Sequence, residues 1–117
     1  MKEDITTPLS EDAIRIHRAA TSLPDDESCA RLAEFYSAFA DSGRIKIISA
    51  LKAAGELCVK DIAHVTGSSE SAISHQLKTL RLMRLVTSRN EGRNVFYRLD
   101  DDHIYDILRA GADHIHE

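Results

Sequence analysis

Hydrophobic residues recur at helical spacing along most of the chain, with short polar breaks between the runs. The first ten residues predict a flexible arm, and Ser10 followed by two acidic residues is typical of a capped helix start. This first helix is expected to end near Leu23, because Pro24 and two aspartates interrupt the pattern. A second amphipathic helix is predicted from apolar residues three and four positions apart, namely Leu32, Phe35, Tyr36 and Phe39.

A third helix is predicted between the polar break at 41–43 and Gly55, which is a typical stop residue. Its inward face is expected to carry Ile45, Ile48 and either Leu51 or Leu57. These three helices predict a mainly α protein.

Residues 58–84 predict a helix-turn-helix, with a short helix at 59–65, a turn at 66–68 and a longer helix at 69–84. Gly67 suits a left-handed residue at the end of the first helix, and Ser69 can cap the second. Ile73, Leu77 and Leu80 form the predicted buried stripe of the longer helix. At 100° per residue, the opposite face is small and polar and fits a DNA major groove; it carries Ser71, Ser74, His75 and Lys78.

Residues 85–99 alternate between apolar and polar positions around a predicted turn at 90–92, which indicates a β-hairpin. Val86, Val95 and Tyr97 are its expected strand residues, and Arg89 and Arg93 near the tip could reach DNA phosphate. A helix-turn-helix followed directly by a basic hairpin predicts a winged helix-turn-helix, mainly α with a small β-hairpin, as one domain over 1–117.

The charge distribution supports a DNA-binding centre. The chain carries −4 overall, but residues 44–98 contain 10 basic and 4 acidic groups, while both flanking segments are acidic. There is no apolar signal core at the N-terminus and no membrane-length apolar run, and the two cysteines make no disulfide framework. We therefore expect a cytoplasmic protein that does not associate with membranes.

The C-terminal segment 101–117 predicts an acidic helix with metal-ligand side chains beside its apolar stripe. His103 and His114 stand eleven residues apart on one side, which is nearly three helical turns and roughly 16 Å. A Zn²⁺ ion needs ligand atoms about 2.0–2.2 Å away, so these two histidines cannot share an ion within one chain.

Two copies of this helix packed antiparallel resolve the difficulty. Asp101 and His103 of one copy then meet His114 and Glu117 of the other, and the two-fold symmetry creates two identical sites. Two imidazoles and two carboxylates suit Zn²⁺, with Co²⁺ and Ni²⁺ as competitors. His116 lies one step off this face and is a weaker candidate to replace Glu117.

The stretch "ELCVKDIAHVTGSSESAISHQLKTLRLMRLVTSRNEGRNVFYRLDDDHI" resembles the ArsR/SmtB family of metal-responsive repressors, and its zinc-sensing branch most. The resemblance runs from Leu32 to the C-terminus, and its most specific parts are "ELCV-D-A", "S-SAISHQLK-LR" and the "D-H…H--E" ending. It implies a homodimer through the N- and C-terminal helices that binds operator DNA when metal-free and releases it when metal binds between the C-terminal helices. It also implies a hydrogen bond from the metal-bound His114 towards the end of the recognition helix near Arg84.

A second family site binds soft metals through "ELCVCD" and cysteines of the N-terminal arm. This sequence keeps Cys58 and Asp61, but Lys60 replaces the second cysteine and the arm offers only His17. A site of His17, Cys58 and Asp61 is conceivable, although a structural Cys58 is the favoured interpretation.

Three alternatives to a zinc-responsive repressor stay open. The same fold could sense another signal, such as Co²⁺, Ni²⁺, a soft metal or thiol oxidation at Cys29 and Cys58. A small zinc hydrolase is disfavoured, because four protein ligands would leave no open coordination position. A winged helix that only dimerises with proteins would lack salt-dependent DNA binding.

Overall fold

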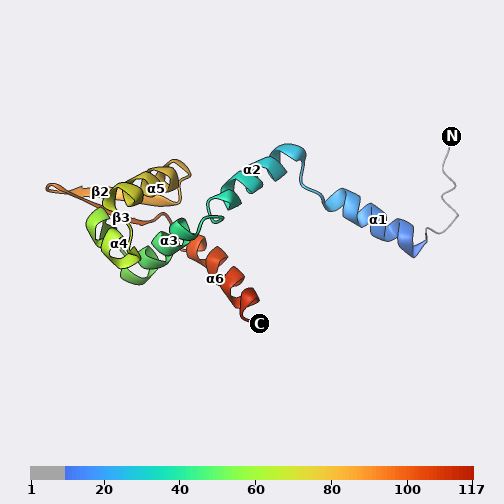
Figure 1. Ribbon diagram of the computed structural model, residues 1–117. Helices are drawn as coiled ribbons and strands as arrows, with labels where there is room; N and C mark the ends of the chain where they lie inside the picture. The colour runs from blue at the N-terminus through green and yellow to red at the C-terminus, as the bar shows by residue number, and fades with distance from the viewer. Residues whose placement is uncertain (1–9) are drawn as a thin grey trace. The chain divides into compact units, whose positions relative to one another are not determined.

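The computed structural model describes residues 10–117, which divide into two compact units, one ending at Leu32 and the other running from Ala33 to Glu117 (Figure 1). The first contains helix α1 (Glu11–Ser22), whose N–H of Ala13 donates to the Oγ of Ser10 at 3.1 Å, confirming the predicted cap. Helix α2 (Asp26–Ser37) begins in this unit. Most of the predicted arm lies outside the described residues.

Helix α3 (Ser42–Ala54) begins after Asp41, whose carboxylate caps it, and ends at Gly55 with a φ of 85°. Its buried residues are Ile47, Ile48 and Leu51. The prediction that Ile45 points inward is wrong, since Ile45 is 38% exposed. Positions 47, 48 and 51 share one side of the helix, and Ile45 lies at the border of that stripe.

Helices α4 (Val59–Thr66) and α5 (Glu70–Leu82) form the predicted helix-turn-helix. Gly67 between them has φ 70° and ψ 25°, the left-handed conformation that favours glycine. Ile73, Leu77 and Leu80 are buried as predicted. Helix α5 ends two residues earlier than predicted, and Arg84 beyond its end has a φ of 60°, which is incompatible with a continuing right-handed helix.

The predicted hairpin is strands β2 (Val86–Glu91) and β3 (Asn94–Leu99). The turn was expected at 90–92, but Glu91 pairs with Asn94, so the loop is Gly92 and Arg93. Gly92 has a φ of 60°, and a glycine in the first position of a two-residue loop matches the right-handed twist of the strands. A third strand, β1 (Leu57–Cys58), was not predicted; it gives a sheet in the order β1-β3-β2.

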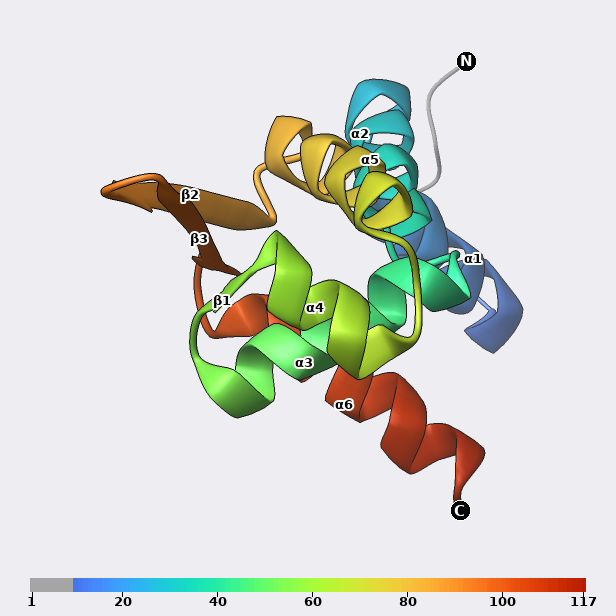
Figure 2. The ribbon, with the colours of Figure 1, turned by 60° about the vertical axis from the view of Figure 1, so that its left-hand side comes forward.

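Helix α6 (His103–Ile115) completes the second unit and buries Ile104. It packs against α3, and Figure 2 shows it extending away from helices α3, α4 and α5 on the side of α3. The core of this unit consists of aliphatic side chains from α3, α4, α5, β2 and α6, with Ala38 just before α3. Within residues 10–117, no helix is long and apolar enough to cross a membrane.

Candidate nucleic-acid interface and metal-ligand pairs

Helix α5 presents a polar face opposite its buried stripe. The first turn is fixed by Ser69, whose Oγ accepts from the backbone N–H of Ala72 at 3.1 Å. The four residues predicted to face DNA are all exposed, namely Ser71, Ser74, His75 and Lys78. Exposure and polarity together make this face available to base edges and phosphates.

A groove of about 400 Å³ lies between this helix and the sheet, lined by Ser74, Leu77, Lys78, Arg81, Leu82 and Tyr97. It adds a second cation, Arg81, to the predicted basic surface. Arg81 was not among the predicted DNA-facing residues, although it follows Lys78 by three positions and Ser74 by seven and therefore falls on the same helix face. Tyr97 was expected only as a strand residue.

Helix α5 is held on the opposite side by a polar network. The Nε2 of Gln76 donates to Oδ2 of Asp41 at 3.0 Å, and Nη1 of Arg44 donates to Oε1 of Gln76 at 3.2 Å. Arg44 also donates from Nε to the carbonyl of Ala38 at 2.8 Å. Because these partners lie at the start of α3, the network fixes the recognition helix against the body of the unit.

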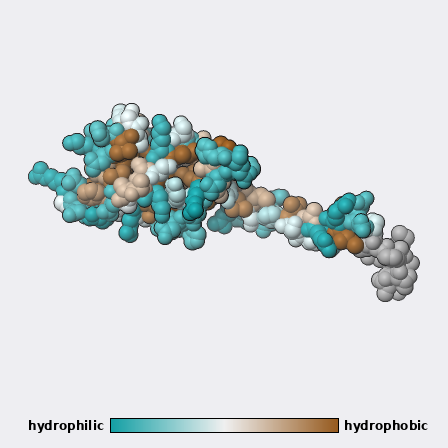
Figure 3. Space-filling model, turned by 90° about the horizontal axis from the view of Figure 1, so that it is seen from below, coloured by the Kyte–Doolittle hydropathy of each residue, from teal (hydrophilic) through white to brown (hydrophobic). Residues whose placement is uncertain are grey.

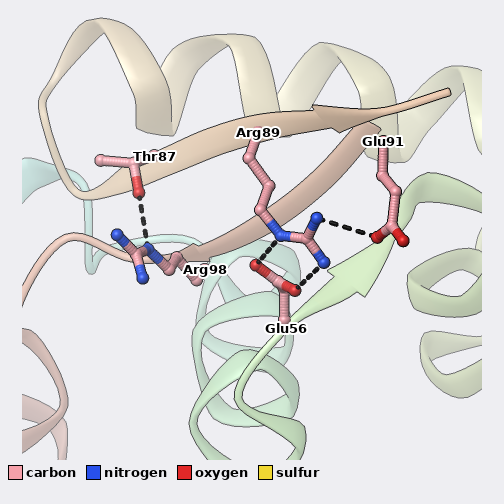
Figure 4. A network of polar contacts seen from close by, with 5 residues as sticks. All are labelled: Glu56, Thr87, Arg89, Glu91 and Arg98. Carbon is pink, nitrogen blue, oxygen red and sulfur yellow. Dashed lines mark hydrogen bonds and ion pairs between the residues drawn. The ribbon is translucent and has the colours of Figure 1, made fainter. Parts of the chain in front are cut away.

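The wing carries a second polar network, around Arg89 (Figure 4). Its Nε and Nη2 donate to the two carboxylate oxygens of Glu56, at 2.8 and 2.7 Å, and its Nη1 donates to Glu91 at 2.8 Å. The hydrogen bonds that Arg89 donates lower the pKa of Glu56, and accepting carboxylates at Glu56 and Glu91 raise the pKa of Arg89. Arg93 in the wing loop is exposed and, among the described residues, forms no ion pair. The phosphate contacts proposed for both arginines stay predictions.

The predicted metal ligands form two pairs, one at each end of α6. Oδ1 of Asp101 lies 3.1 Å from Nδ1 of His103, and Oε2 of Glu117 lies 3.8 Å from Nδ1 of His114. The side chains of His103 and His114 are 90% and 84% exposed. No group of three or more His, Cys, Asp or Glu side chains that could hold an ion comes together in residues 10–117. Within one chain, the donor set is therefore split into halves.

Asp101 precedes the helix and also accepts a hydrogen bond from the backbone N–H of His103, at 2.7 Å. The helix was predicted over residues 101–117, whereas α6 begins at His103. The same carboxylate oxygen also lies beside the imidazole of His103, so the short loop before α6 holds this predicted pair together.

The second candidate site is present only in part. The Sγ of Cys58 lies 3.2 Å from Oδ2 of Asp61, and the thiol is partly buried. His17 belongs to α1, in the N-terminal unit, where it is exposed. Cys29 is exposed on α2.

Figure 3 shows one face of the second unit, on which hydrophobic patches lie among mostly hydrophilic residues. One apolar groove of about 370 Å³ runs between α3 and α6. Its walls carry Phe39 and Ile45 on one side and Ile107, Leu108 and Ile115 on the other. Ile115, at the end of α6, is 77% exposed, whereas Ile104 in the first turn is the buried residue of this helix.

Comparison with known proteins bears on the function of these surfaces. Residues 41–88 match the model described as "Bacterial regulatory protein, arsR family". A cadmium resistance transcriptional regulatory protein CadC homolog from Staphylococcus aureus is 33% identical over 111 residues, covering 95% of this chain and 89% of that protein. The chain belongs to the ArsR family of bacterial regulatory proteins.

Another member of the ArsR family is more similar over a shorter stretch. A transcriptional repressor SmtB homolog from Synechocystis sp. is 52% identical over 87 residues, covering 74% of this chain. The matched stretch spans 65% of that relative's length. The relatives are transcriptional regulators rather than enzymes, and the resemblance read from the helix-turn-helix and wing motifs is confirmed.

The fold of this ArsR-family chain is also that of a solved relative. The structure of a homodimeric winged helix-turn-helix DNA-binding domain from Mycobacterium bovis superposes with a TM-score of 0.66 at 28% identity. The superposed region covers 79% of this chain and 90% of the chain from Mycobacterium bovis. The predicted winged helix-turn-helix class is therefore confirmed.

Proposed function

We propose that this protein is a homodimeric, metal-sensing repressor that binds operator DNA in the cytoplasm when metal-free and releases it when Zn²⁺ binds between the two C-terminal helices. The observation that carries the proposal is the division of four metal-ligand side chains into two exposed pairs at opposite ends of α6. Membership of the ArsR family supplies the DNA-binding part.

The proposed DNA surface combines α5 and the wing. Ser71, Ser74 and His75 would contact base edges in the major groove, since hydroxyl and imidazole groups can donate and accept hydrogen bonds there. Lys78 and, at the wing tip, Arg93 would meet phosphate, and both side chains are exposed. Arg89 belongs to the same basic wing, but its guanidinium is engaged by Glu56 and Glu91.

The proposed metal site needs a second copy. If two α6 helices pack antiparallel, Asp101 and His103 of one protomer meet His114 and Glu117 of its partner, giving two nitrogen and two oxygen donors. The apolar groove between α3 and α6 and the exposed Ile115 supply hydrophobic surface for such packing. The donor set fits Zn²⁺ and also permits Co²⁺ or Ni²⁺.

A short backbone path joins this site to the recognition helix. The N–H of Asp100, adjacent to the ligand Asp101, donates to the carbonyl of Leu85 at 3.0 Å. Leu85 follows Arg84, and its own N–H donates to the carbonyl of Leu80 inside α5. We propose that a metal that fixes the ends of α6 shifts the recognition helices through this path, aided by a hydrogen bond from His114 towards Arg84.

The deciding experiment is a DNA-binding titration. An operator duplex is first selected from a random pool with metal-free protein, and binding is then followed during additions of Zn²⁺, Co²⁺, Ni²⁺ and Cd²⁺. Release by Zn²⁺, lost in Asp101→Ala and His103→Ala, is the expected result. Metal binding without any change in DNA affinity contradicts the sensing function. A His114 replacement that still binds metal but lacks the second ring nitrogen should retain DNA; if metal still releases it, the His114 link is wrong.

One observation favours a second candidate, a repressor of the same fold that responds to a soft metal or thiol oxidation. Cys58 and Asp61 are within 3.2 Å of each other, so half of a thiolate site exists. Cys58→Ser and Cys29→Ser separate the two candidates, because only the second function requires a thiol. A Zn²⁺ response that survives both substitutions leaves the α6 site as the sensor.

A further inference from the structure

The wing contains an arginine whose hydrogen-bonding edge is already filled by carboxylates. Arg89 lies on β2, and its guanidinium binds both oxygens of Glu56 in a two-pronged pair, while Glu91 takes the remaining nitrogen (Figure 4). All three nitrogens of Arg89 therefore donate to the chain's own acceptors.

The geometry of this pair matters for DNA binding. The fork of an arginine fits a carboxylate and a phosphate in the same bidentate manner, so one edge cannot serve both at once. The guanidinium also lies over the ring of Phe96, with its carbon 4.9 Å from the ring centroid. Both an edge and a face of Arg89 are thus occupied within the folded chain.

Glu56 belongs to a different part of the fold. It follows Gly55 at the end of α3 and precedes β1, whereas Arg89 lies on β2, and β3 runs between β1 and β2 in the sheet. The pair therefore spans the sheet and connects the end of α3 to the wing. Its side chains are partly shielded, with exposed fractions of 49% for Arg89 and 29% for Glu56.

Arg93, the other arginine predicted to contact phosphate from the wing, differs from Arg89 in its surroundings. Arg93 lies in the two-residue loop and forms no ion pair with any described residue. Of the two arginines that the sequence assigns to phosphate, only Arg93 is available in this conformation.

We propose that Glu56 is an internal competitor for phosphate at the wing, holding Arg89 out of DNA contact and so limiting the affinity and salt dependence of DNA binding. Glu56 is thus a positioning residue that acts through Arg89. The inference rests on the proposed function in one respect, namely that this wing approaches DNA.

The test is the salt dependence of DNA binding by Glu56→Gln. Glutamine keeps the shape but replaces one acceptor oxygen by N–H groups, which cannot receive the arginine's second hydrogen bond. Non-specific binding depends on phosphate contacts, so the probe is a fluorescein-labelled random-sequence duplex of about 30 base pairs, long enough for two half-sites. Fluorescence anisotropy is measured with the whole metal-free protein between about 50 and 200 mM salt.

The slope of log K against log salt is about −0.9 per phosphate neutralised, so Glu56→Gln should steepen it by about 1 for each wing. For a dimer, the affinity should then fall about tenfold more than wild type across this salt range. Arg89→Gln alone should leave the slope close to wild type, whereas Arg93→Gln should reduce it. Loss of a purely structural brace would change stability without steepening the slope.

Two controls separate the effect of Arg89 from that of charge. Glu91→Gln makes the same charge change but leaves the two-pronged pair intact, so its slope should stay near wild type. The double variant Glu56→Gln/Arg89→Gln removes both members of the two-pronged pair and should return to the wild-type slope; circular dichroism confirms that each variant is folded.

Three results would overturn the inference. The first is a salt slope for Glu56→Gln equal to that of Glu91→Gln. The second is weaker DNA binding by Glu56→Gln than by wild type. The third is a salt slope for Arg89→Gln that is reduced as far as that of Arg93→Gln. Wild-type protein that binds no duplex at any salt concentration contradicts the proposed function itself, and the role of Glu56 with it.

Discussion

A heterodimer of two variants, each lacking one of the predicted histidine ligands, tests whether the metal ligands come from different protomers. In the proposed site, His103 of one protomer meets His114 of its partner. His103→Ala and His114→Ala should each destroy both sites of a homodimer. A heterodimer of the two variants, however, restores one complete site, built from the intact His103 of one chain and the intact His114 of the other, and leaves the second site without either histidine.

The magnitude follows from the length of α6. The two histidines stand eleven residues apart on a single continuous helix. At about 1.5 Å per residue they are separated by roughly 16 Å along the axis, whereas ligands of one Zn²⁺ ion lie about 2.0–2.2 Å from it. The expected numbers of tightly bound ions per dimer are therefore about two for wild type, none for either variant homodimer and one for the heterodimer.

The assay is competition against a chromophoric zinc chelator, with heterodimers isolated by two different affinity tags. His64→Ala, which removes an exposed histidine on α4, is the matched control and should retain two ions. A heterodimer that binds no metal more tightly than its parents refutes the shared site. If either variant homodimer still binds two ions, the histidine replaced in that variant is not a metal ligand. For His114→Ala, this result would make His116 the next histidine to test.

Three further predictions concern the frame that holds these surfaces. Leu80→Ala should cost about 2–5 kcal/mol of unfolding free energy in urea, because Leu80 is fully buried, whereas Leu82→Ala on the same helix should cost about 0.5 kcal/mol or less, since Leu82 is 77% exposed. Equal losses would contradict the orientation of α5. Gly67→Ala should lower the free energy of unfolding by about 1 kcal/mol, because alanine disfavours the left-handed backbone and an added Cβ meets no neighbour, and Gly67→Asn should lower it by less; a larger loss with asparagine would contradict this cause. Gln76→Leu should cost about 1 kcal/mol and weaken DNA binding at an unchanged salt slope, because Gln76 holds α5 without touching phosphate; a changed slope would contradict this role.

Residues with strong local chemistry made much of the fold predictable. Ser10 and Ser69 cap the helices that they were expected to cap, and Gly55 and Gly67 end helices with positive φ. These features depend on hydrogen bonds and backbone sterics within a few residues, which a single sequence contains in full. The buried stripe of α5 was predictable for the same reason, because three leucine and isoleucine positions repeat at helical spacing.

Features that depend on distant partners were not predictable. Strand β1 has only two residues, and it becomes a strand because Leu57 and Cys58 pair with Tyr97 and Phe96, forty or so positions away. The partner of Arg89 was missed for the same reason, since Glu56 precedes it by 33 residues. The wing turn lies at Gly92 and Arg93 instead of the predicted 90–92, because strand register is set by cross-strand pairing and not by the turn sequence alone.

The candidate site shows the same division between local and distant information. The ligand types and their eleven-residue spacing were readable from the chain, and spacing alone excluded a site within one helix. The orientation of Asp101 towards His103 was not readable, because it depends on where α6 begins.

The arrangement of the two ligand pairs gives a reason why metal should act on DNA binding at all. The pair at Asp101 is continuous with β3 and is hydrogen bonded, through Asp100, to the segment that follows the recognition helix. The pair at His114 lies at the other end of α6, eleven residues of helix after His103. In the proposed dimer, an ion that joined the first pair of one protomer to the second pair of its partner would therefore couple the wing end of one chain to the far end of the other. Because operator half-sites have a fixed separation, a change in that coupling alters the fit of both recognition helices together. If metal bound both pairs but left the distance between spin labels on the two α5 helices unchanged, release of DNA would require another cause.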